Sequence, residues 1–397
     1  MDTALTIKIK LVESPKEFDV LTKRFCNACN YVSNWIFNHD FELNQAKLNK
    51  ILYYKIRDEF NLKAQLTQSV FRSVVARYKS VRTQISKQPY KFKDINTSKW
   101  YSLPRDLTWL KKPLKFSKPQ ADLQRNRDWS IVNGKLSINT LSNRVHCNYI
   151  CKGFDKYLNA DWKFGMAKLI KQNNIWYFYV SITKTIPDYD NNQTQHVVGI
   201  DRGLRFLATC YNEKGNVKFF SGRQILAKRR KFKRLRSQLQ SKNTKSAKRR
   251  LKQIGHRENR WMTDVNHQLS KTLVKTYGKN TLFVLEDLTN VTFNTTKNRL
   301  KDHRYEHNSW AFYQLEQFLT YKANLNSSKV ITIDPAYTSQ RCVKCGRINK
   351  DNRNHHLHLY ICDKCGYQSN DDRIASMNIQ FLGTEYISGI VNPSFKN

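Results

Sequence analysis

The chain has 397 residues, which is too long for one ordinary domain, so its length predicts two or three domains. Lys and Arg number 70 against 31 Asp and Glu, and the resulting net charge of +39 would repel itself unless a polyanion, most naturally nucleic acid, neutralises it. The 40% of hydrophobic residues exclude a disordered basic tail, and the lack of a long apolar run or a signal peptide predicts a cytoplasmic protein with no membrane partner.

The first part of the chain predicts a strand followed by helices. Residues 3–12 alternate between apolar and polar side chains, which is typical of a strand, and Ser14 and Pro15 can cap and open a helix. Residues 68–85 place apolar side chains on one helical face and arginines among the other positions. Residues 89–117 mix Pro, Lys and aromatic side chains without a period, so we expect an irregular connection there.

A second group of strands follows this connection. Four short segments have a period of two or a strand-like composition, and they are residues 136–138, 145–149, 164–170 and 175–182. The last two predict a hairpin that turns at Asn173 and Asn174. Because residues 3–12 have no early partner, we expect them to pair with this later sheet or small barrel, with the helices inserted between.

The second half of the chain predicts an α/β domain after a linker at residues 186–195. From His196 the expected order is strand, hairpin, basic helices, strand, helix, strand, cysteine-rich segment and helix; its later elements are residues 282–285, 310–321, 330–333 and 372–381. Residues 223–260 contain sixteen Lys or Arg and only one acid, Glu258. A solvated basic helix is the simpler interpretation, but so many like charges favour contact with a phosphate backbone.

Two C-x-x-C pairs, separated by sixteen residues, predict a metal site. The four cysteines are Cys342, Cys345, Cys362 and Cys365. Their spacing fits a closed zinc ribbon with one structural Zn²⁺, and the glycines after each pair, Gly346 and Gly366, allow tight turns. A chance pairing of buried cysteines is the alternative. Three loop histidines could also replace a thiolate, namely His355, His356 and His358.

Three carboxylates occupy positions where a negative charge calls for a partner. Asp201 ends the apolar strand at residues 197–200, Glu286 ends the strand at residues 282–285, and Asp372 opens a helix whose positive terminus favours an anion. Clustered carboxylates repel one another unless divalent cations lie between them, and two Mg²⁺ ions in such a site can hydrolyse a phosphodiester. The alternative is that each acid is a surface turn or cap residue.

These motifs resemble the transposon-encoded TnpB family, which is related to compact type V CRISPR effectors and to the Fanzor proteins. Residues 199–204 resemble the first motif of its RuvC-like nuclease, and residues 285–288 the second. The third motif usually reads D-x-N-A-A-x-N-I, and residues 372–379 depart from it at Ile374 and Ser376, with Asp371 as an alternative to Asp372. Other matching segments are residues 334–337, 338–346 and 163–168 and the side chains Cys29, Asn30, Tyr31 and Trp35.

The resemblance implies a multidomain α/β protein with a β-barrel and a helical lobe. Its parts are an N-terminal wedge β-barrel interrupted by a helical recognition lobe, and an RNase H-like RuvC nuclease domain with an inserted four-cysteine zinc ribbon. The corresponding boundaries are 1–13 and 113–187 for the wedge, 14–112 for the recognition lobe, 188–195 for the linker, 196–337 and 368–397 for the nuclease, and 338–367 for the ribbon.

The resemblance also implies the activity. We expect a prokaryotic RNA-guided DNA endonuclease that carries a guide RNA from its own element and cuts double-stranded DNA beside a short flanking motif, at the nucleoid. Asp201, Glu286 and Asp372 would be its catalytic ligands for two Mg²⁺ ions. The alternatives are an RNA-guided DNA-binding repressor that does not cleave, an RNA-independent DNA-binding accessory of transposition and, more remotely, a junction resolvase.

Overall fold

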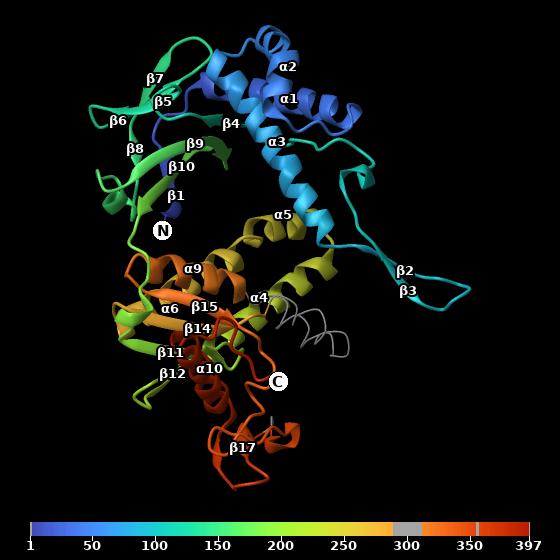
Figure 1. Ribbon diagram of the computed structural model, residues 1–397. Helices are drawn as coiled ribbons and strands as arrows, with labels where there is room; N and C mark the ends of the chain where they lie inside the picture. The colour runs from blue at the N-terminus through green and yellow to red at the C-terminus, as the bar shows by residue number, and fades with distance from the viewer. Residues whose placement is uncertain (1, 289–311, 355–356, 397) are drawn as a thin grey trace. The chain divides into compact units, whose positions relative to one another are not determined.

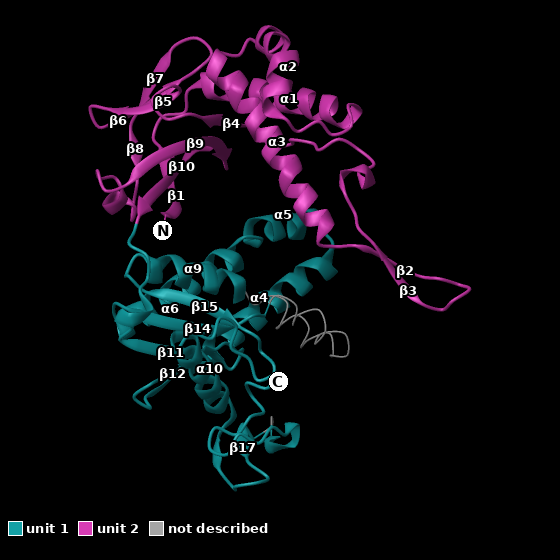
Figure 2. Cartoon of the chain, in the orientation of Figure 1, with its two compact units in different colours: residues 1, 186–397 teal, residues 2–185 magenta. Residues whose placement is uncertain are grey.

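The computed structural model describes residues 2–288, 312–354 and 357–396. They divide into two compact units, Asp2–Thr185 and Ile186–Asn397 (Figure 2). Among the described residues, no helix combines the length and the apolar character needed to cross a lipid bilayer. The helix expected at residues 310–321 begins, as far as the structure describes it, at Phe312, because Trp310 and Ala311 lie outside the described residues.

A five-stranded antiparallel sheet forms the base of the N-terminal unit (Figure 1). Its order is β4-β9-β10-β1-β8, and the strands are β1 (Asp2–Leu11), β4 (Gln120–Leu123), β8 (Tyr149–Ile150), β9 (Lys163–Gln172) and β10 (Ile175–Thr185). Leu5 pairs with Ile182, so the opening strand does join the later sheet as predicted. Asn173 and Asn174 turn the β9–β10 hairpin with φ of 50° and 60°, the left-handed pair that a type I′ turn requires.

The expected β-barrel is wrong for the residues that the structure describes, because the strands form open sheets. The edges of the five-stranded sheet are β4 and β8, and β8 pairs with β1 only at Lys10 and Leu11. A separate three-stranded sheet contains β5 (Trp129–Val132), β6 (Lys135–Asn139) and β7 (Arg144–Cys147). Closing a barrel requires the two edge strands to pair with each other, and edge strands as short as these offer too few backbone partners for that.

Three helices are inserted between β1 and the rest of the sheet, as predicted. They are α1 (Lys16–Asn38), α2 (Gln45–Glu59) and α3 (Ala64–Ser86). Pro15 occupies the N-cap position of α1 without a side-chain cap, so the predicted capping by Ser14 is wrong. The buried Ser33 hydroxyl lies 3.1 Å from the Tyr78 hydroxyl and joins α1 to α3.

Two short strands replace the predicted irregular connection after α3. They are β2 (Tyr90–Lys93) and β3 (Trp100–Leu103), which pair as an antiparallel hairpin. Four residues a strand, flanked by Pro and Lys, are too few to show a period of two in the sequence. Short 3₁₀ helices lie at Leu107–Trp109, Asp155–Tyr157, Asn191–Gln193 and Lys350–Asn352.

The C-terminal unit is built on a mixed five-stranded sheet, which confirms the predicted α/β order. Its order is β13-β12-β11-β14-β15, and the strands are β11 (His196–Asp201), β12 (Phe206–Asn212), β13 (Val217–Ser221), β14 (Thr281–Glu286) and β15 (Lys329–Ile333). The three strands β11, β14 and β15 are parallel. The helices are α4 (Arg223–Lys242), α5 (Lys245–Ile254), α6 (Arg257–Tyr277), α9 (Phe312–Asn324) and α10 (Asp371–Ile387).

Helices cover both faces of this sheet. On one face, Ile200 and Phe283 pack with Leu269 of α6 and Leu319 of α9. On the other face, Val284 packs with residues of α10. Buried strands flanked by helices on both sides explain why the segments at residues 197–200 and 282–285 are continuously apolar.

The cysteine-rich segment forms a small sheet that leads directly into α10. Its strands are β16 (Arg353–Asn354), β17 (Leu359–Ile361) and β18 (Gln368–Asn370). Its core contains Cys342, Tyr360 and Cys362 together with Ile374 from the first turn of α10. Ile374, one of the two departures from the third family motif, therefore serves the packing between the ribbon and the helix.

Candidate active site and metal centres

Helix α10 lies against β11 and runs in the opposite direction, and two glycines set this close approach. A Cβ at Gly199 would collide with the backbone oxygen of Ser376. A Cβ at Gly383 would lie 2.8 Å from the Val197 side chain. Since the later helix residue meets the earlier strand residue, the N-terminus of α10 lies at the C-terminal end of β11.

We therefore expect Gly199→Ala to destabilise the C-terminal unit. The added methyl group would collide with helix backbone, which cannot move aside as a flexible side chain can, and overpacking of this kind costs about 1–3 kcal/mol or more. Chemical denaturation measures the loss. Gly165→Ala is the control, because the nearest heavy atom among the described residues, apart from the chain neighbours of Gly165, lies 3.5 Å from the position that the added methyl group would take. Equal stabilities of the two variants would contradict the packing argument.

The three acids singled out in the sequence lie at this same edge of the sheet. Asp201 and Glu286 follow Ile200 and Leu285, which are register partners in the parallel pair β11–β14. Asp372 precedes Ser376 by four helical residues, a rise of about 6 Å, which matches the span of about 6.6 Å from Gly199 to Asp201 along an extended strand. The fold thus brings Asp372 to the level of Asp201.

The electrostatics of these acids reflect their proximity. Burial, followed by the negative charges of Glu286 and Asp372, raises the pKa of Asp201 well above its usual value. Burial also raises the pKa of Glu286, although Thr338 donates a hydrogen bond of 2.6 Å to its carboxylate. Burial and then Asp371 raise the pKa of Asp372 to about 6.

The donor set of these three acids is of the chemical kind that divalent cations bind. Asp201, Glu286 and Asp372 are all partly exposed residues rather than fully buried ones. Their oxygen atoms are the ligands that Mg²⁺ prefers, and a bound cation would relieve the repulsion that raises their pKa values.

Neighbouring side chains tie together the elements that carry the acids. Arg202 is buried, and it donates to the Glu286 backbone oxygen at 2.5 Å and to the Glu316 carboxylate at 3.0 Å. The buried Asn378 amide of α10 donates to the backbone oxygens of Thr338 and Arg341, both at 2.8 Å. Arg202 thereby ties the end of β14 to α9, and Asn378 ties the start of the ribbon to α10.

The ribbon also places two basic side chains beside the acids at the start of α10, a contact that the sequence did not predict. Arg353 contacts the buried Asp371 carboxylate at 2.9 Å and approaches Asp372 at 3.7 Å. The Nδ1 atom of His358 lies 3.5 Å from Asp371. Asp371, the alternative to Asp372, thus has ribbon side chains as its partners. The negative charge of Asp372 also raises the pKa of Asp201 more than the charge of Asp371 does. The only sequence signal for Arg353 and His358 is their place between the two cysteine pairs.

Arg353→Ala is expected to lower the stability of the C-terminal unit by about 3–5 kcal/mol, because it leaves the Asp371 carboxylate buried without its cation. Urea denaturation of the variant gives this difference. Arg347→Ala is the matched control in the same ribbon: its partner Asp363 is partly exposed, and surface pairs contribute about 0–1 kcal/mol. A similar loss in both variants would contradict a special role for the buried pair.

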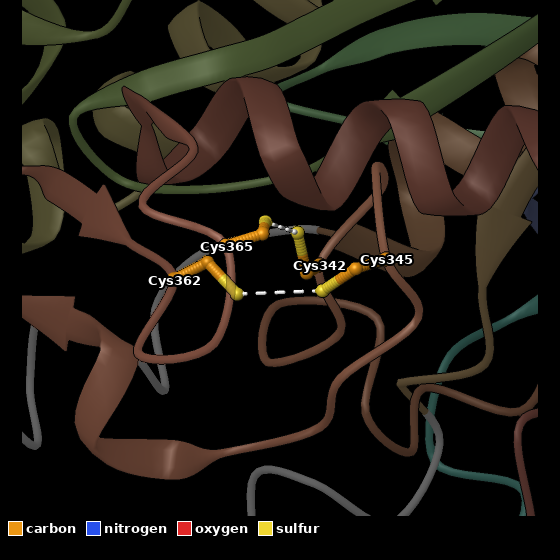
Figure 3. A group of neighbouring side chains, drawn as sticks. All are labelled: Cys342, Cys345, Cys362 and Cys365. Carbon is orange, nitrogen blue, oxygen red and sulfur yellow. Dashed lines mark hydrogen bonds between the residues drawn. The ribbon is translucent and has the colours of Figure 1, made fainter.

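The four predicted cysteine ligands come together in the ribbon and point toward one another (Figure 3). The Sγ atoms of Cys342 and Cys365 are 3.6 Å apart, and those of Cys345 and Cys362 are 3.5 Å apart. Four thiolates around Zn²⁺ at about 2.3 Å in a tetrahedron have sulfurs about 3.8 Å apart, so the geometry fits this ion.

Two further features suit the cysteines to a metal. Gly346 and Gly366 have φ of 74° and 68°, so each turns in the left-handed region as predicted. Burial raises the pKa of the Cys362 thiol, but the backbone N–H groups of Cys365 and Lys364, together with the neighbouring thiols of Cys345 and Cys365, lower it overall to about 7. Of the alternative histidine ligands, His355 and His356 lie outside the described residues, and His358 faces Asp371.

Comparisons with known proteins match two families, mainly within the C-terminal unit. Residues 180–292 match the family described as "Probable transposase", and residues 312–379 match the family described as "Cas12f1-like, TNB domain". The second match spans α9, β15, the whole cysteine-rich segment and the start of α10.

Curated relatives are similar over part of the chain. A CRISPR-associated endodeoxyribonuclease Cas12f1 of Sulfoacidibacillus thermotolerans is 40% identical over 29% of this chain and 25% of its own length. The TnpB-like protein MJ0751 of Methanocaldococcus jannaschii is 25% identical over 59% of this chain and 85% of its own. The putative RNA-guided DNA endonuclease InsQ of Escherichia coli is 26% identical over 58% of this chain and 60% of its own. The chain therefore spans less than two thirds of the Cas12f1 and InsQ proteins.

A solved structure supports the fold. The structure of CasPhi-2 (Cas12j) bound to crRNA and phosphorothioate-DNA superposes with a TM-score of 0.55, at 11% identity, over 99% of this chain and 93% of that one. Identity this low speaks for the fold alone. Together with the family matches and the named relatives, the comparisons identify the chain as a relative of the TnpB-like proteins and the Cas12f1 endonucleases, as its sequence motifs predict.

Proposed function

We propose that the chain is an RNA-guided DNA endonuclease that cleaves double-stranded DNA beside a short flanking motif, in the cytoplasm of a prokaryotic cell. The observation that carries this proposal is the meeting of three acids, Asp201, Glu286 and Asp372, at one sheet edge in a strongly cationic chain. The names of the relatives, which include an endodeoxyribonuclease and a putative RNA-guided DNA endonuclease, support it.

In this proposal the three acids hold two Mg²⁺ ions in a RuvC-like site. Bound there, the ions would activate a water molecule and stabilise the leaving oxygen of the cleaved phosphodiester. Thr338 orients the Glu286 carboxylate through its hydrogen bond of 2.6 Å. Arg353 offers a cation beside Asp372, where an incoming phosphate would also find a partner.

The nucleic acids would bind along basic surfaces. Helix α4 carries its Lys and Arg residues mostly exposed, with Arg229 as its buried residue, and α5 continues this character. Such helices suit the phosphates of a guide RNA paired with its target, whose sequence is read by base pairing rather than by side chains. The N-terminal unit would hold the RNA, transcribed from the protein's own element, and the flanking DNA motif, while the zinc ribbon would guide the target strand.

Purification with bound RNA tests the proposal. We expect a discrete RNA to copurify, and the complex to cut a plasmid that carries the complement of its guide when Mg²⁺ is present and not when EDTA is added. Binding to the plasmid without any cleavage in Mg²⁺ would favour a repressor that does not cut. DNA binding by protein that carries no RNA would favour an accessory of transposition.

A further inference from the structure

The hairpin of β2 and β3 gathers apolar side chains on one face and leaves them in solvent. Tyr90 pairs with Leu103 and Phe92 with Tyr101 across the two strands. Because side chains alternate between the two faces of a strand, these four share one side, which we call the aromatic face. Tyr90, Tyr101 and Leu103 are exposed and Phe92 is half-buried. Figure 1 shows the hairpin projecting away from helices α1 to α3 of its own unit.

The rings of the aromatic face are nearly parallel. The centroids of Tyr90 and Phe92 are 6.0 Å apart with an angle of 22° between the planes, and those of Phe92 and Tyr101 are 5.7 Å apart with 26°. Trp109 extends the row, 5.5 Å from Tyr90, and the Arg105 guanidinium lies 5.5 Å from the Trp109 ring. Exposed flat rings with cations beside them are the surfaces on which unpaired nucleobases stack.

The charge around the hairpin also favours a nucleic acid. Residues 87–112 contain seven Lys or Arg and two Asp. Both acids serve their own turns: Asp94 accepts from the Asn96 backbone N–H at 2.8 Å, and Asp106 accepts from the Thr108 backbone N–H at 3.0 Å. A second copy of the chain would bring the same positive charge to the contact, whereas a phosphate backbone neutralises it.

We infer that the aromatic face binds unpaired nucleotides of the RNA that the protein carries, with bases stacked on Tyr90, Phe92 and Tyr101. Paired bases inside a duplex offer no free face for such stacking, so the bound segment is single-stranded. The choice of RNA rests on the proposed function, because a guide RNA is bound before any DNA and is the constant partner of this face. A two-stranded hairpin is marginally stable alone, and such a partner would stabilise it.

Photo-crosslinking of the full-length complex tests the inference. The protein is purified from cells grown with 4-thiouridine, irradiated with near-ultraviolet light and digested, and the crosslinked peptides are identified by mass spectrometry. We expect crosslinks at Phe92 and Tyr101. In the double variant Phe92→Ala, Tyr101→Ala, the yield of crosslinks within residues 90–103 should drop by about tenfold or more, measured against crosslinks on α4 in the same sample. The single variant Phe92→Trp should retain them.

Trp100→Ala is the matched control. Trp100 is 71% exposed but pairs with Lys93 and therefore lies on the opposite face of the hairpin, so its removal should leave the crosslinks at Phe92 and Tyr101 unchanged.

Two outcomes would overturn the inference. The first is RNA that crosslinks to α4 but nowhere within residues 90–103. The second is a double variant whose crosslinks are unchanged but whose mass in solution falls from dimer to monomer, which would assign the aromatic face to a second copy. Protein that carries no RNA contradicts the proposed function instead, and a short 4-thiouridine oligonucleotide added to the full chain then applies the same two criteria to the hairpin.

Discussion

Asp201→Asn is expected to reduce Mg²⁺-dependent DNA cleavage by more than about a hundredfold. Loss of a residue that only supports a metal ligand costs about 10- to 100-fold, and loss of a ligand itself should cost more. The substitution keeps the size of the side chain but removes a negative oxygen from the group formed with Glu286 and Asp372. Cleavage of a guide-matched plasmid by the purified RNA complex, followed over time, gives the rate. Unchanged cleavage would end the assignment of Asp201 as a catalytic ligand.

The same variant has a second expected effect that a mere loss of folding cannot produce. Because burial and then neighbouring negative charges raise the pKa of Asp201, its ionised form is unfavourable in the folded protein without metal. Asp201→Asn should therefore melt at a higher temperature than the parent protein in EDTA, with about 2–4 °C for each kcal/mol gained. Asp264→Ala, at an exposed acid on α6, should change neither the melting temperature nor the cleavage rate.

Cys342→Ser is expected to abolish zinc binding at the four-cysteine cluster and, with it, most of the cleavage. Cys342 is buried in the ribbon core beside Tyr360 and Ile374, so loss of the metal should loosen the whole segment. That segment supplies Thr338 to Glu286 and Arg353 to the acids at the start of α10. We expect about one zinc ion fewer per chain by elemental analysis, and at least about a tenfold loss of cleavage.

Cys26→Ser provides the control for that substitution. Cys26 belongs to the N-terminal unit, where its thiol donates to the Phe116 backbone oxygen at 3.1 Å, and a serine hydroxyl can do the same. This variant should keep its zinc content and its activity. A Cys342→Ser protein that cleaves at the parent rate after losing its zinc would show that the ribbon does not support the acid site.

The sequence by itself determined the features that depend on short-range patterns. Alternation predicted the opening strand, and its lack of an early partner predicted that it joins the later sheet, where it pairs with β10. The apolar runs that end at Asp201 and Glu286 predicted two strands of an α/β sheet, and the structure pairs them in parallel, so that their carboxyl ends meet at one edge. The spacing of the two cysteine pairs predicted the sulfur cluster, because the turn that each C-x-x-C-G segment makes is local.

Other features were decided only by the tertiary structure. The sheet of the N-terminal unit stays open, because its short edge strands have no partner in the described chain to close it. The strands of the β2–β3 hairpin are too short to show a period of two in the sequence. Arg353 meets Asp371 across a turn of the ribbon, where no periodicity connects them. The direction of α10 depends on the contacts of Gly199 and Gly383 with distant segments. Periodicity reports which face of an element is buried, whereas the pairing of charges and the approach of helix to strand arise from long-range packing.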